Sequence, residues 1–475
     1  MLSFMILFQS LAILISCWIR NNSLTIFVLE QVDMKNGFPV KQLGAAKIAS
    51  SLQISCRSKH ENFKFVDDDN CILHDVAVYS VNKEKNAYSF EQAGPRAQSY
   101  FDASEVRAGI VTCGGLCPGI NNVIRTIVMQ LHHNYGVQHM HGFRYGFQGF
   151  IPSYQHEIMD LTPDNVRNIH NLGGSILSSS RGPQDPSEIV DCLKRNNIQI
   201  LFCIGGDGTL HGAHAIAEEV ERRKEKISII CIPKTIDNDI PYCVKTFGFE
   251  TAFSKAVEAV QAAHSEAYGR NYGVVIIKLM GRNSGFIAAN TSLACPDVNF
   301  VLIPEVPFTI QGEKGLLRLL ERRFENKKKQ SRHPHSVIVV AEGAGQDLLG
   351  NNGEERDASG NIRFKDIGFF LKENIQKYFK DRYPVNIKLI EPSYMIRSLP
   401  ANPHDAIFCY YLADHAVHAA MAGKTDMMVG YWNGHFTHVP LEIVNKNQKR
   451  IDPHGEFWRQ VLFSTGQAGD LYSHK

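Results

Sequence analysis

The sequence predicts an α/β protein with two similar doubly wound α/β domains and a largely irregular N-terminal extension. From residue 105 onward, short runs rich in valine and isoleucine alternate with segments whose apolar residues recur at helical spacing. The runs are apolar throughout, which indicates strands buried on both faces, as in parallel sheets covered by helices. Seven such pairs are more than one compact sheet accommodates, so we expect two domains.

The elements follow one another in order along the chain. Strands are expected at the apolar runs 107–113, 198–204, 227–233, 272–281, 300–306, 336–343 and 386–392. Each strand precedes a segment with helical spacing, such as NNVIRTIVMQL after the first run. Helices are expected at 121–131, 212–224, 251–269, 284–294, 313–329, 369–380 and 405–423. The polar stretch 346–366, which contains several Gly and Asn residues, is expected to be an exposed loop.

These elements suggest four parts of the chain. Residues 1–100 form the extension, which shows little regular periodicity. Residues 101–248 together with about 398–445 are expected to form one α/β domain, and residues 249–397 the other. Residues 446–475 are expected to be a C-terminal tail.

Composition excludes several classes of protein. The chain has 475 residues, of which 44% are hydrophobic and 21% charged, as in ordinary soluble proteins and unlike disordered, collagen-like or multi-span membrane chains. Lys and Arg number 50 against 48 Asp and Glu, a formal net charge of +2. No global charge therefore favours nucleic acid or an acidic membrane as a partner, and any anion site must be local.

Cysteine usage favours a reducing compartment. The eleven cysteines are odd in number, include no CxxC pair, and several lie inside apolar runs, as Cys203 and Cys231 do. Buried free thiols are the expected state, and a zinc site at Cys113 and Cys117 is not favoured because no second pair accompanies them. We expect a cytoplasmic protein, with an organelle such as a plastid or glycosome as the alternative.

Residues 1–20 are strongly apolar and need a separate interpretation. About 18 residues would just reach the length of a membrane span, but Gln9, Ser10 and Ser16 interrupt the stretch. No basic region precedes it, as a secretory signal would require. Three interpretations stay open: an upstream extension without function, an organelle-targeting or membrane-tethering segment, and an element packed on the surface. Membrane association is otherwise not expected.

Two glycine-rich loops follow predicted strands, at the edge where open α/β sheets bind ligands. Gly114 and Gly115 precede a helix whose free N–H groups suit phosphate, although a plain tight turn is the alternative. Gly206, Asp207 and Gly208 form the second loop. An aspartate beside phosphate calls for a cation between them, and Mg²⁺ fits; a helix cap is the alternative role for Asp207.

Carboxylates and arginines follow other strands. Asp237 and Asp239 lie two residues apart beside Lys234, where a carboxylate could take a proton from an attacking hydroxyl, or where the residues could simply form an Asx-rich turn. Three arginines stand in strand-end loops, at Arg181, Arg282 and Arg397. One such arginine alone would be an ordinary surface charge. Together with the two loops, they indicate a site for a polyphosphate donor, Mg²⁺ and a phosphorylated acceptor.

The motifs VTCGGLCPGINNVIR, SSSRG, IGGDGT, PKTIDNDIP, KLMGRNSGFIA, VVAEGAGQ and EPSYMIR, in this order, resemble the 6-phosphofructokinase family over roughly residues 90–465. The resemblance implies transfer of a phosphoryl group to the 1-hydroxyl of fructose 6-phosphate in glycolysis. It also implies two similar α/β domains with the active site in the cleft between them. The resemblance also implies a homo-oligomer, usually a tetramer and alternatively a dimer. An allosteric enzyme is expected as well.

The resemblance implies specific roles for residues of this chain. Asp237 would be the general base, with Arg282 and Thr235 as further catalytic residues, and Asp207 would hold Mg²⁺ through its shell. The donor would be contacted by Gly115, Arg181, Gly182, Gly206, Asp207, Gly208 and Thr209. The sugar or its 6-phosphate would be contacted by Thr235, Ile236, Asp237, Met280, Gly281, Arg282, Glu342, Lys388, Tyr394, Met395, Ile396 and Arg397.

Two positions depart from the compact bacterial members of the family. Those enzymes use arginines lent by a neighbouring subunit for the 6-phosphate, at the positions where this chain has Gly273 and Lys388. Lys388 can still bind phosphate as a point charge, whereas Gly273 cannot. Arg270 is a candidate substitute for the latter.

The family divides by phosphoryl donor, and this chain combines features of both branches. Lys234 resembles the pyrophosphate users, whereas Gly208 stands where those enzymes carry an aspartate that would repel the α-phosphate of ATP. This combination resembles the long ATP-dependent branch, so ATP is the expected donor and pyrophosphate the alternative. A non-catalytic regulatory subunit is a second alternative, but such chains should have lost Asp207, Asp237 or Arg282.

Overall fold

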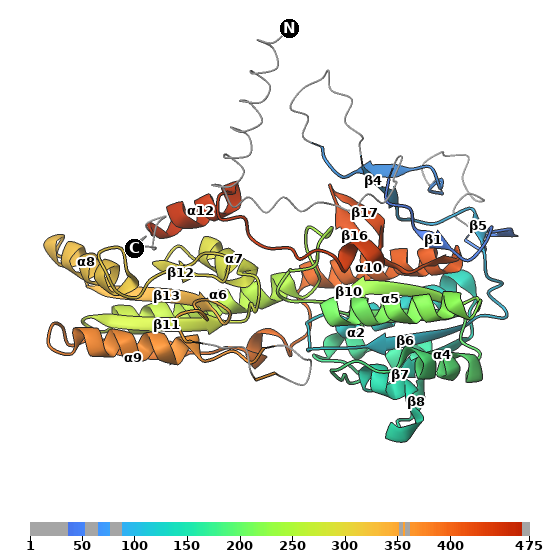
Figure 1. Cartoon of the computed structure of the whole chain (residues 1–475), viewed down its shortest axis with the longest axis horizontal. Helices are drawn as coiled ribbons and strands as arrows, with labels where there is room; N and C mark the ends of the chain where they lie inside the picture. Colours follow the sequence, from blue (N-terminus) through green and yellow to red (C-terminus); the bar gives the residue numbers. More distant parts are fainter. Residues whose placement is uncertain (1–36, 53–64, 77–87, 351–354, 357–361, 468–475) are drawn as a thin grey trace, which may run out of the picture.

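The computed structural model describes residues 37–52, 65–76, 88–350, 355–356 and 362–467. The chain forms two lobes that lie beside each other along its long axis (Figure 1). All seven apolar runs that predict strands lie in one of two sheets, three in the larger lobe and four in the smaller. The predicted pair of α/β sheets is therefore confirmed.

The larger lobe contains a nine-stranded mixed sheet with the order β3-β4-β17-β16-β10-β9-β6-β7-β8. The five strands from β16 to β7 run parallel, whereas β8 at one edge and β17, β4 and β3 at the other join antiparallel. The sequence did not predict these edge strands. Their bounds, in sheet order, are Cys71–Leu73, Ser89–Gln92, His435–Pro440, Met427–Trp432, Ser228–Pro233, Ile200–Gly205, Arg107–Thr112, His139–Phe143 and Ile158–Asp160.

Both faces of this sheet are buried, as the unbroken apolar runs require. Ile110 and Phe202 face one core with helices α2 (Ile120–Gln130) and α10 (Pro403–Met421). Their neighbours Val111 and Cys203 face a second core with α4 (Pro186–Arg195) and α5 (Asp207–Arg222). Because successive side chains of a strand point to opposite faces, a run with helices on both sides shows no polar alternation.

The smaller lobe contains a fully parallel sheet with the order β12-β13-β11-β14. One face packs on α6 (Phe249–Tyr268) and α7 (Phe286–Ala294), and the other on α8 (Leu316–Lys329) and α9 (Ile367–Phe379). The strands, in sheet order, are Phe300–Leu302, His335–Ala341, Gly273–Leu279 and Asn386–Ile390.

Three segments connect the lobes: the one that enters α6, the one between β14 and α10, and the C-terminal segment. The N-cap of α6 is Gly248, whose φ of +84° and crowded surroundings admit only glycine, since a Cβ there would lie 2.2 Å from Cys117 Sγ. The C-terminal segment leaves the larger lobe after α11 (Leu441–Val444) and reaches α12 (Glu456–Thr465) on the smaller one (Figure 1). The α12 helix packs against α7 and buries Trp458.

Part of the N-terminal extension belongs to the larger sheet. Its strand β4 pairs with β17, and Phe90 is fully buried. Next to it, Glu91 forms ion pairs with Arg96 at 2.7 Å and Lys424 at 2.8 Å and receives a hydrogen bond from His438. Burial alone would raise the pKa of Glu91, but His438 and the charge of Lys424 hold it well below its usual range.

Two sequence expectations concern residues only partly covered. Residues 1–20 lie outside the described residues. Within the described ones, no helix is both long and apolar enough to cross a membrane. The nine cysteines in the described residues are free thiols, and all but Cys71 are buried.

Candidate active site

The first glycine-rich loop lies between β6 and α2 and bends sharply at Gly114, whose φ is +82°. Ser179 Oγ donates a 2.6 Å hydrogen bond to the Gly114 carbonyl, and the Gly114 N–H donates to Ser180 O at 3.0 Å. These bonds join the loop to the Ser-rich segment that precedes Arg181. The glycines leave this turn without side chains, so its backbone is open to a ligand.

Three cations converge on this loop. Lys234 Nζ donates a 2.6 Å hydrogen bond to Gly115 O, and Lys234 is 4% exposed. A Cβ on Gly115 would lie 3.5 Å from Arg397 Nη1 and 3.6 Å from Arg181 Nη2. Burial lowers the pKa of Lys234; the nearby thiols of Cys117 and Cys113 oppose this, while the charges of Arg397 and Arg181 lower it further. Like charges held this close indicate an anion site, because phosphate would relieve their repulsion.

The second glycine-rich loop joins β9 to the N-terminus of α5. Gly206 is the N-cap, and its carbonyl accepts hydrogen bonds from the N–H groups of Thr209 and Leu210. Asp207 is the first residue of the helix and is about half exposed. A Cβ on Gly208 would have no heavy atom within 4 Å, so the space beside this position is open. The helix N-terminus adds positive partial charge that suits phosphate.

The loop after β10 carries both carboxylates of the predicted base motif. Thr235 Oγ1 accepts a 3.1 Å hydrogen bond from the Asp237 N–H, and Thr246 Oγ1 donates to Thr235 O at 2.6 Å. Asn238 follows with a φ of +53°, and its Oδ1 accepts from the Thr246 N–H at 3.1 Å. These bonds hold a tight turn directly at the end of a buried strand.

Asp237 has the electrostatics of a proton acceptor. Its Oδ1 is buried and has no hydrogen-bond partner. Burial raises the pKa of the Asp237 carboxyl well above its usual range, and the charges of Asp239 and Glu342 add to this, against a backbone hydrogen bond from Arg282 and the charge of Arg397. A buried carboxylate oxygen without a hydrogen-bond partner, close enough to Arg397 to feel its charge, fits a general base that receives a hydroxyl proton.

Asp207 and Asp239 follow the neighbouring strands β9 and β10, and the charge of Asp207 reaches Asp239. Burial raises the pKa of Asp239, a hydrogen bond from Thr235 lowers it, and the charge of Asp207 raises it again. The two carboxylates, at the ends of two different strands, therefore interact electrostatically. Within the described residues, no cluster of three or more His, Cys, Asp and Glu side chains has metal-ligand geometry.

Glu342 and Arg282 extend the site into the smaller lobe. Gly281 has a φ of +127° and its carbonyl accepts from the Gly343 N–H at 3.1 Å, which ties the Arg282 loop to the end of β13. Burial raises the pKa of Glu342, whereas the charges of Arg282 and Lys278 lower it. The Arg282 guanidinium itself stacks over Phe364 at 4.3 Å and donates to the Ile362 carbonyl. It is thus held by the loop before α9, and among the described residues no ion pair joins it to a carboxylate.

The remaining predicted residues fall into two groups. Met280 Sδ lies 4.0 Å from Arg397 Nη1, Thr209 is buried in the first turn of α5, and Gly182 has a φ of +97° beside Arg181. Tyr394 and Met395 are 73% and 77% exposed, which leaves them free to meet a ligand. The side chains of Ile236 and Ile396 lie in the core, so only their backbones can face one.

The structure does not bring Lys388 into this cluster. It is exposed on β14, where it pairs with Val275, and among the described residues no hydrogen bond or ion pair joins it to the site. Gly273 begins β11, and a Cβ there would lie 2.2 Å from the Ala267 carbonyl, so this position cannot carry an arginine without moving the end of α6. Arg270 is exposed and lies 3.8 Å from Glu266.

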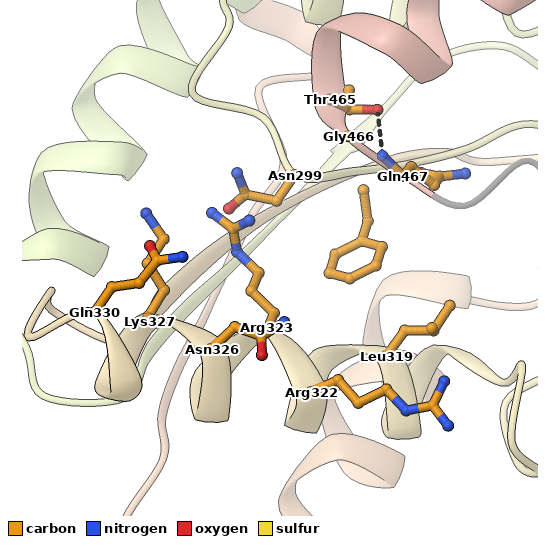
Figure 2. Close-up of a pocket in the computed structure, with 11 residues that line it drawn as sticks. Asn299, Leu319, Arg322, Arg323, Asn326, Lys327, Gln330, Thr465, Gly466 and Gln467 are labelled. Carbon is orange, nitrogen blue, oxygen red and sulfur yellow. Dashed lines mark hydrogen bonds between the residues drawn. The ribbon is translucent and has the colours of Figure 1, made fainter.

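A cavity of about 730 Å³ opens over the first loop. Its lining includes Arg181, Arg397, the two glycines Gly114 and Gly115, and the segment Gly173–Ser180 in part. A second cavity of about 380 Å³ lies between α8 and the end of α12, where Thr465 and Gln467 are hydrogen-bonded (Figure 2). It lies at the beginning of β12, whereas ligands of open α/β sheets bind at the carboxyl ends of strands. The first cavity is therefore the candidate active site.

Two features of this cavity were not predicted as site residues. Gly173, Gly174 and Ser175 line it, although only the SSSRG motif that follows them was singled out. The sequence treats Lys234 only as a mark of donor type, whereas its ammonium group bonds to the Gly115 carbonyl beneath this cavity, without lining it. A lysine that directly follows an apolar strand, in a chain whose glycine loops indicate phosphate, is the signal that could have identified it.

Comparison with known proteins places this geometry in context. The family model described as "Phosphofructokinase" matches residues 107–420. A Borreliella burgdorferi protein named "ATP-dependent 6-phosphofructokinase" is 46% identical over 434 residues, covering 90% of this chain and 96% of that protein. An Amycolatopsis methanolica protein of the same name is 42% identical over 443 residues, covering 91% and 95%. One from Trypanosoma cruzi is 46% identical over 390 residues, covering 81% and 78%.

Solved structures share the fold at lower identity. The chain is similar to a pyrophosphate-dependent phosphofructokinase from Marinobacter aquaeolei, with a TM-score of 0.60 and 20% identity, covering 78% of this chain and 94% of that one. It is also similar to Pichia pastoris phosphofructokinase in the T-state, with a TM-score of 0.60 and 18% identity, covering 76% and 38%. These two likenesses concern the fold alone.

Proposed function

Because the chain belongs to the phosphofructokinase family, we propose that it is an ATP-dependent 6-phosphofructokinase (EC 2.7.1.11) that converts fructose 6-phosphate to fructose 1,6-bisphosphate. One observation carries the proposal. The cations Lys234, Arg181 and Arg397 converge on the Gly114–Gly115 turn, and the charge of Arg397 also acts on Asp237, whose Oδ1 is buried without a hydrogen-bond partner. These contacts support a site for a polyanionic donor beside a proton acceptor.

In the proposed reaction, Asp237 takes the proton of the sugar 1-hydroxyl. The hydroxyl oxygen forms a bond to the γ-phosphorus of ATP, and the bond from that phosphorus to the bridging oxygen breaks, releasing ADP. The pKa of Asp237 is raised by burial, so it lies closer to neutral pH than the pKa of an exposed aspartate. A general base is most effective when its pKa lies near the pH at which the enzyme works. The barrier to transfer is lowered by the cations Lys234, Arg181 and Arg397, which would stabilise the negative charge on the phosphoryl oxygens in the transition state.

Glu342 and Arg282 are proposed to bind the sugar from the smaller lobe, together with Thr235, Met280 and Gly281. The exposed Tyr394 and Met395 would cover it. The 6-phosphate would contact Arg397, whose guanidinium lines the cavity. A contact with Lys388 would require the sugar to extend as far as β14.

The carboxylate pair fits Mg²⁺, the cation that this donor requires. Asp207 and Asp239 offer oxygen ligands on neighbouring strand ends, and a pair rather than a closed set of three leaves room for water and phosphate oxygens, which Mg²⁺ retains. Asp207 would hold the metal, and Asp239 would assist. When bound, Mg²⁺ neutralises charge on the donor's phosphate oxygens.

ATP is proposed as the donor in preference to pyrophosphate. The open space beside Gly208 supports this, since it leaves room for an α-phosphate next to the helix N-terminus. The three relatives described above that carry ATP in their names support it as well. Assays of ATP-dependent and pyrophosphate-dependent formation of fructose 1,6-bisphosphate, run side by side with Mg²⁺, test the proposal. Turnover with pyrophosphate alone would overturn it.

We propose the domain division, the homo-oligomeric state and the cytoplasmic location that the sequence predicts. The two sheets support a donor-binding domain (101–248 and about 398–445) and a sugar-binding domain (249–397). A homo-oligomer with allosteric control is proposed from the family alone. Light scattering, which measures the mass of the assembly, tests the oligomeric state. Buried free thiols support the cytoplasm. An Arabidopsis thaliana relative whose name includes "chloroplastic" keeps the organelle alternative open.

A further inference from the structure

The C-terminal segment does more than connect the lobes: it lies against the loop that carries Asp237. Lys449 is the point of contact. Its ammonium nitrogen donates hydrogen bonds to Asn238 Oδ1 at 3.0 Å, Cys243 O at 2.8 Å and Val244 O at 2.7 Å. Its backbone N–H donates to Asp239 O at 3.1 Å. One residue thus contacts the base loop, defined here as residues 237–244, at four of its positions.

These contacts satisfy the full donor capacity of the ammonium group. Its three N–H groups donate to three acceptors of one loop. The ammonium nitrogen also lies over the Phe286 ring of α7, 5.1 Å from the ring centroid. The next residues anchor the segment on the smaller lobe, where the Ile451 N–H donates to Glu305 Oε1 at 3.0 Å. Glu305 in turn accepts from the Gly285 N–H at the start of α7. The segment is therefore fixed on one lobe and reaches the base loop of the other.

The geometry at Asn238 makes this contact relevant to the base. Asn238 directly follows Asp237, is buried, and adopts a left-handed backbone conformation. Its side chain receives one bond from Lys449 and another from the Thr246 N–H. Releasing the Asn238 side chain would leave a non-glycine residue at positive φ with fewer restraints, next to the catalytic carboxylate.

We propose that Lys449 is a positioning residue for phosphoryl transfer, which clamps the base loop so that Asp237 faces the sugar hydroxyl. This inference rests on the proposed function for its kinetic consequence, but the clamp itself is a property of the chain. A misplacement of the reacting groups by about 1 Å can cost on the order of a hundredfold in rate, so a clamp of this kind has a large effect on turnover.

The test compares Lys449→Met, Lys449→Arg and the matched control Lys446→Met in the full-length chain. Lys446 lies three residues earlier, is 56% exposed and, within the part of the chain that the structure describes, pairs only with Glu442 one helical turn away. We expect Lys449→Met to lower kcat at least tenfold while the KM for ATP changes less than threefold. Lys449→Arg should restore part of kcat, because arginine keeps a cation with several N–H donors at this position. Lys446→Met should stay within twofold of the parent.

Hydrogen exchange of residues 237–244 provides a readout that does not depend on turnover. Faster exchange confined to this loop in Lys449→Met supports the clamp even if the parent makes no fructose 1,6-bisphosphate, in which case the proposed function alone fails. Equal kcat and equal exchange in Lys449→Met and the parent would overturn the inference. So would exchange that rises evenly along the chain, since that is loss of stability. If Lys449→Met does not fold, the same comparison is made with Lys449→Gln, which keeps one donor group and removes the charge. Equal kcat and equal exchange in Lys449→Gln and the parent would then overturn the inference.

Discussion

Ser284 of the smaller lobe donates a 2.9 Å hydrogen bond from its hydroxyl to the backbone carbonyl of Asp237 in the larger lobe. Ser284 is fully buried and lies two residues after Arg282. The proposed base is therefore held by the same loop that carries a proposed sugar ligand. Closing or opening the lobes relative to each other would move the base and the sugar contacts together.

Removing this bond should slow turnover without unfolding the protein. A neutral hydrogen bond contributes about 0.5–1.5 kcal/mol net, so Ser284→Ala should lower kcat by roughly 2- to 12-fold. The KM for ATP should stay close to that of the parent, because the donor loops do not touch Ser284. Steady-state kinetics with both substrates varied measures this. Ser292→Ala is the matched control, since Ser292 is equally buried but bonds only to Ala288 O within α7; an equal loss in both variants would count against the idea.

Substitution at Gly208 tests the choice of donor. Gly208→Asp places a carboxylate where the α-phosphate of ATP is expected, and we predict at least a tenfold loss of kcat/KM for ATP, about 1.4 kcal/mol. The fold should tolerate the change, because a Cβ there meets no heavy atom within 4 Å and an acidic residue is favourable in the first turn of a helix. The Tm should therefore be unchanged.

The control for charge is Gly208→Asn, which has nearly the same size and no charge. We expect it to keep more ATP activity than Gly208→Asp, and pyrophosphate turnover should be measured in both. ATP kinetics for Gly208→Asp within twofold of the parent would rule out the electrostatic argument for donor selection.

Glu91 should make acid conditions destabilising for the N-terminal edge of the larger sheet. Its pKa is lower in the folded protein than in the unfolded chain, so its stabilising contribution is complete above the usual glutamate pKa. That contribution is lost as pH falls through about 4.5 toward the lower folded value. At neutral pH, Glu91→Gln should cost about 3–5 kcal/mol, because it leaves Lys424, which is 5% exposed, without its closest carboxylate.

Urea unfolding at pH 7.5 and at pH 4 measures both effects, with a smaller difference between Glu91→Gln and the parent at the lower pH. Glu442→Gln is the control, because Glu442 is 54% exposed and its pair with Lys446 contributes less than about 1 kcal/mol. Equal free energies of unfolding for the two variants would contradict the assignment.

The buried strands were predictable from the sequence because helices cover both of their faces. A run such as ILFCIG, buried at every residue, has no polar face that could hide it. The edge strands escaped prediction for the opposite reason. In β17, His435 is exposed and His438 is buried, and Thr437 is buried too, so polarity does not follow burial. Its place in the sheet depends on pairing with β16 and β4, which the local sequence does not encode.

The candidate site divides in the same way. Loops that end strands could be identified, because parallel strands deliver their carboxyl ends to one edge. The contacts of Ser284 and Lys449 with the base loop could not, since Lys449 lies 211 residues after Asn238 and reaches it only once the C-terminal segment crosses between the lobes. The role of Lys388 stays a prediction: it stands where compact bacterial members carry an arginine that serves a neighbouring subunit, and in this chain it is exposed on β14, apart from the cavity.

The measurement that tests the central claim most directly is the kcat of Asp237→Asn beside that of Asp239→Asn, under saturating Mg·ATP. Asparagine is nearly isosteric with aspartate but cannot accept the hydroxyl proton, and a positioned base contributes about 10²–10⁴-fold. We predict that Asp237→Asn lowers kcat at least about 100-fold, roughly 2.7 kcal/mol, with a much smaller change in the KM for fructose 6-phosphate. Asp239→Asn should lose far less at saturating metal. A larger kcat loss at Asp239, or a change at Asp237 confined to KM, would contradict the account.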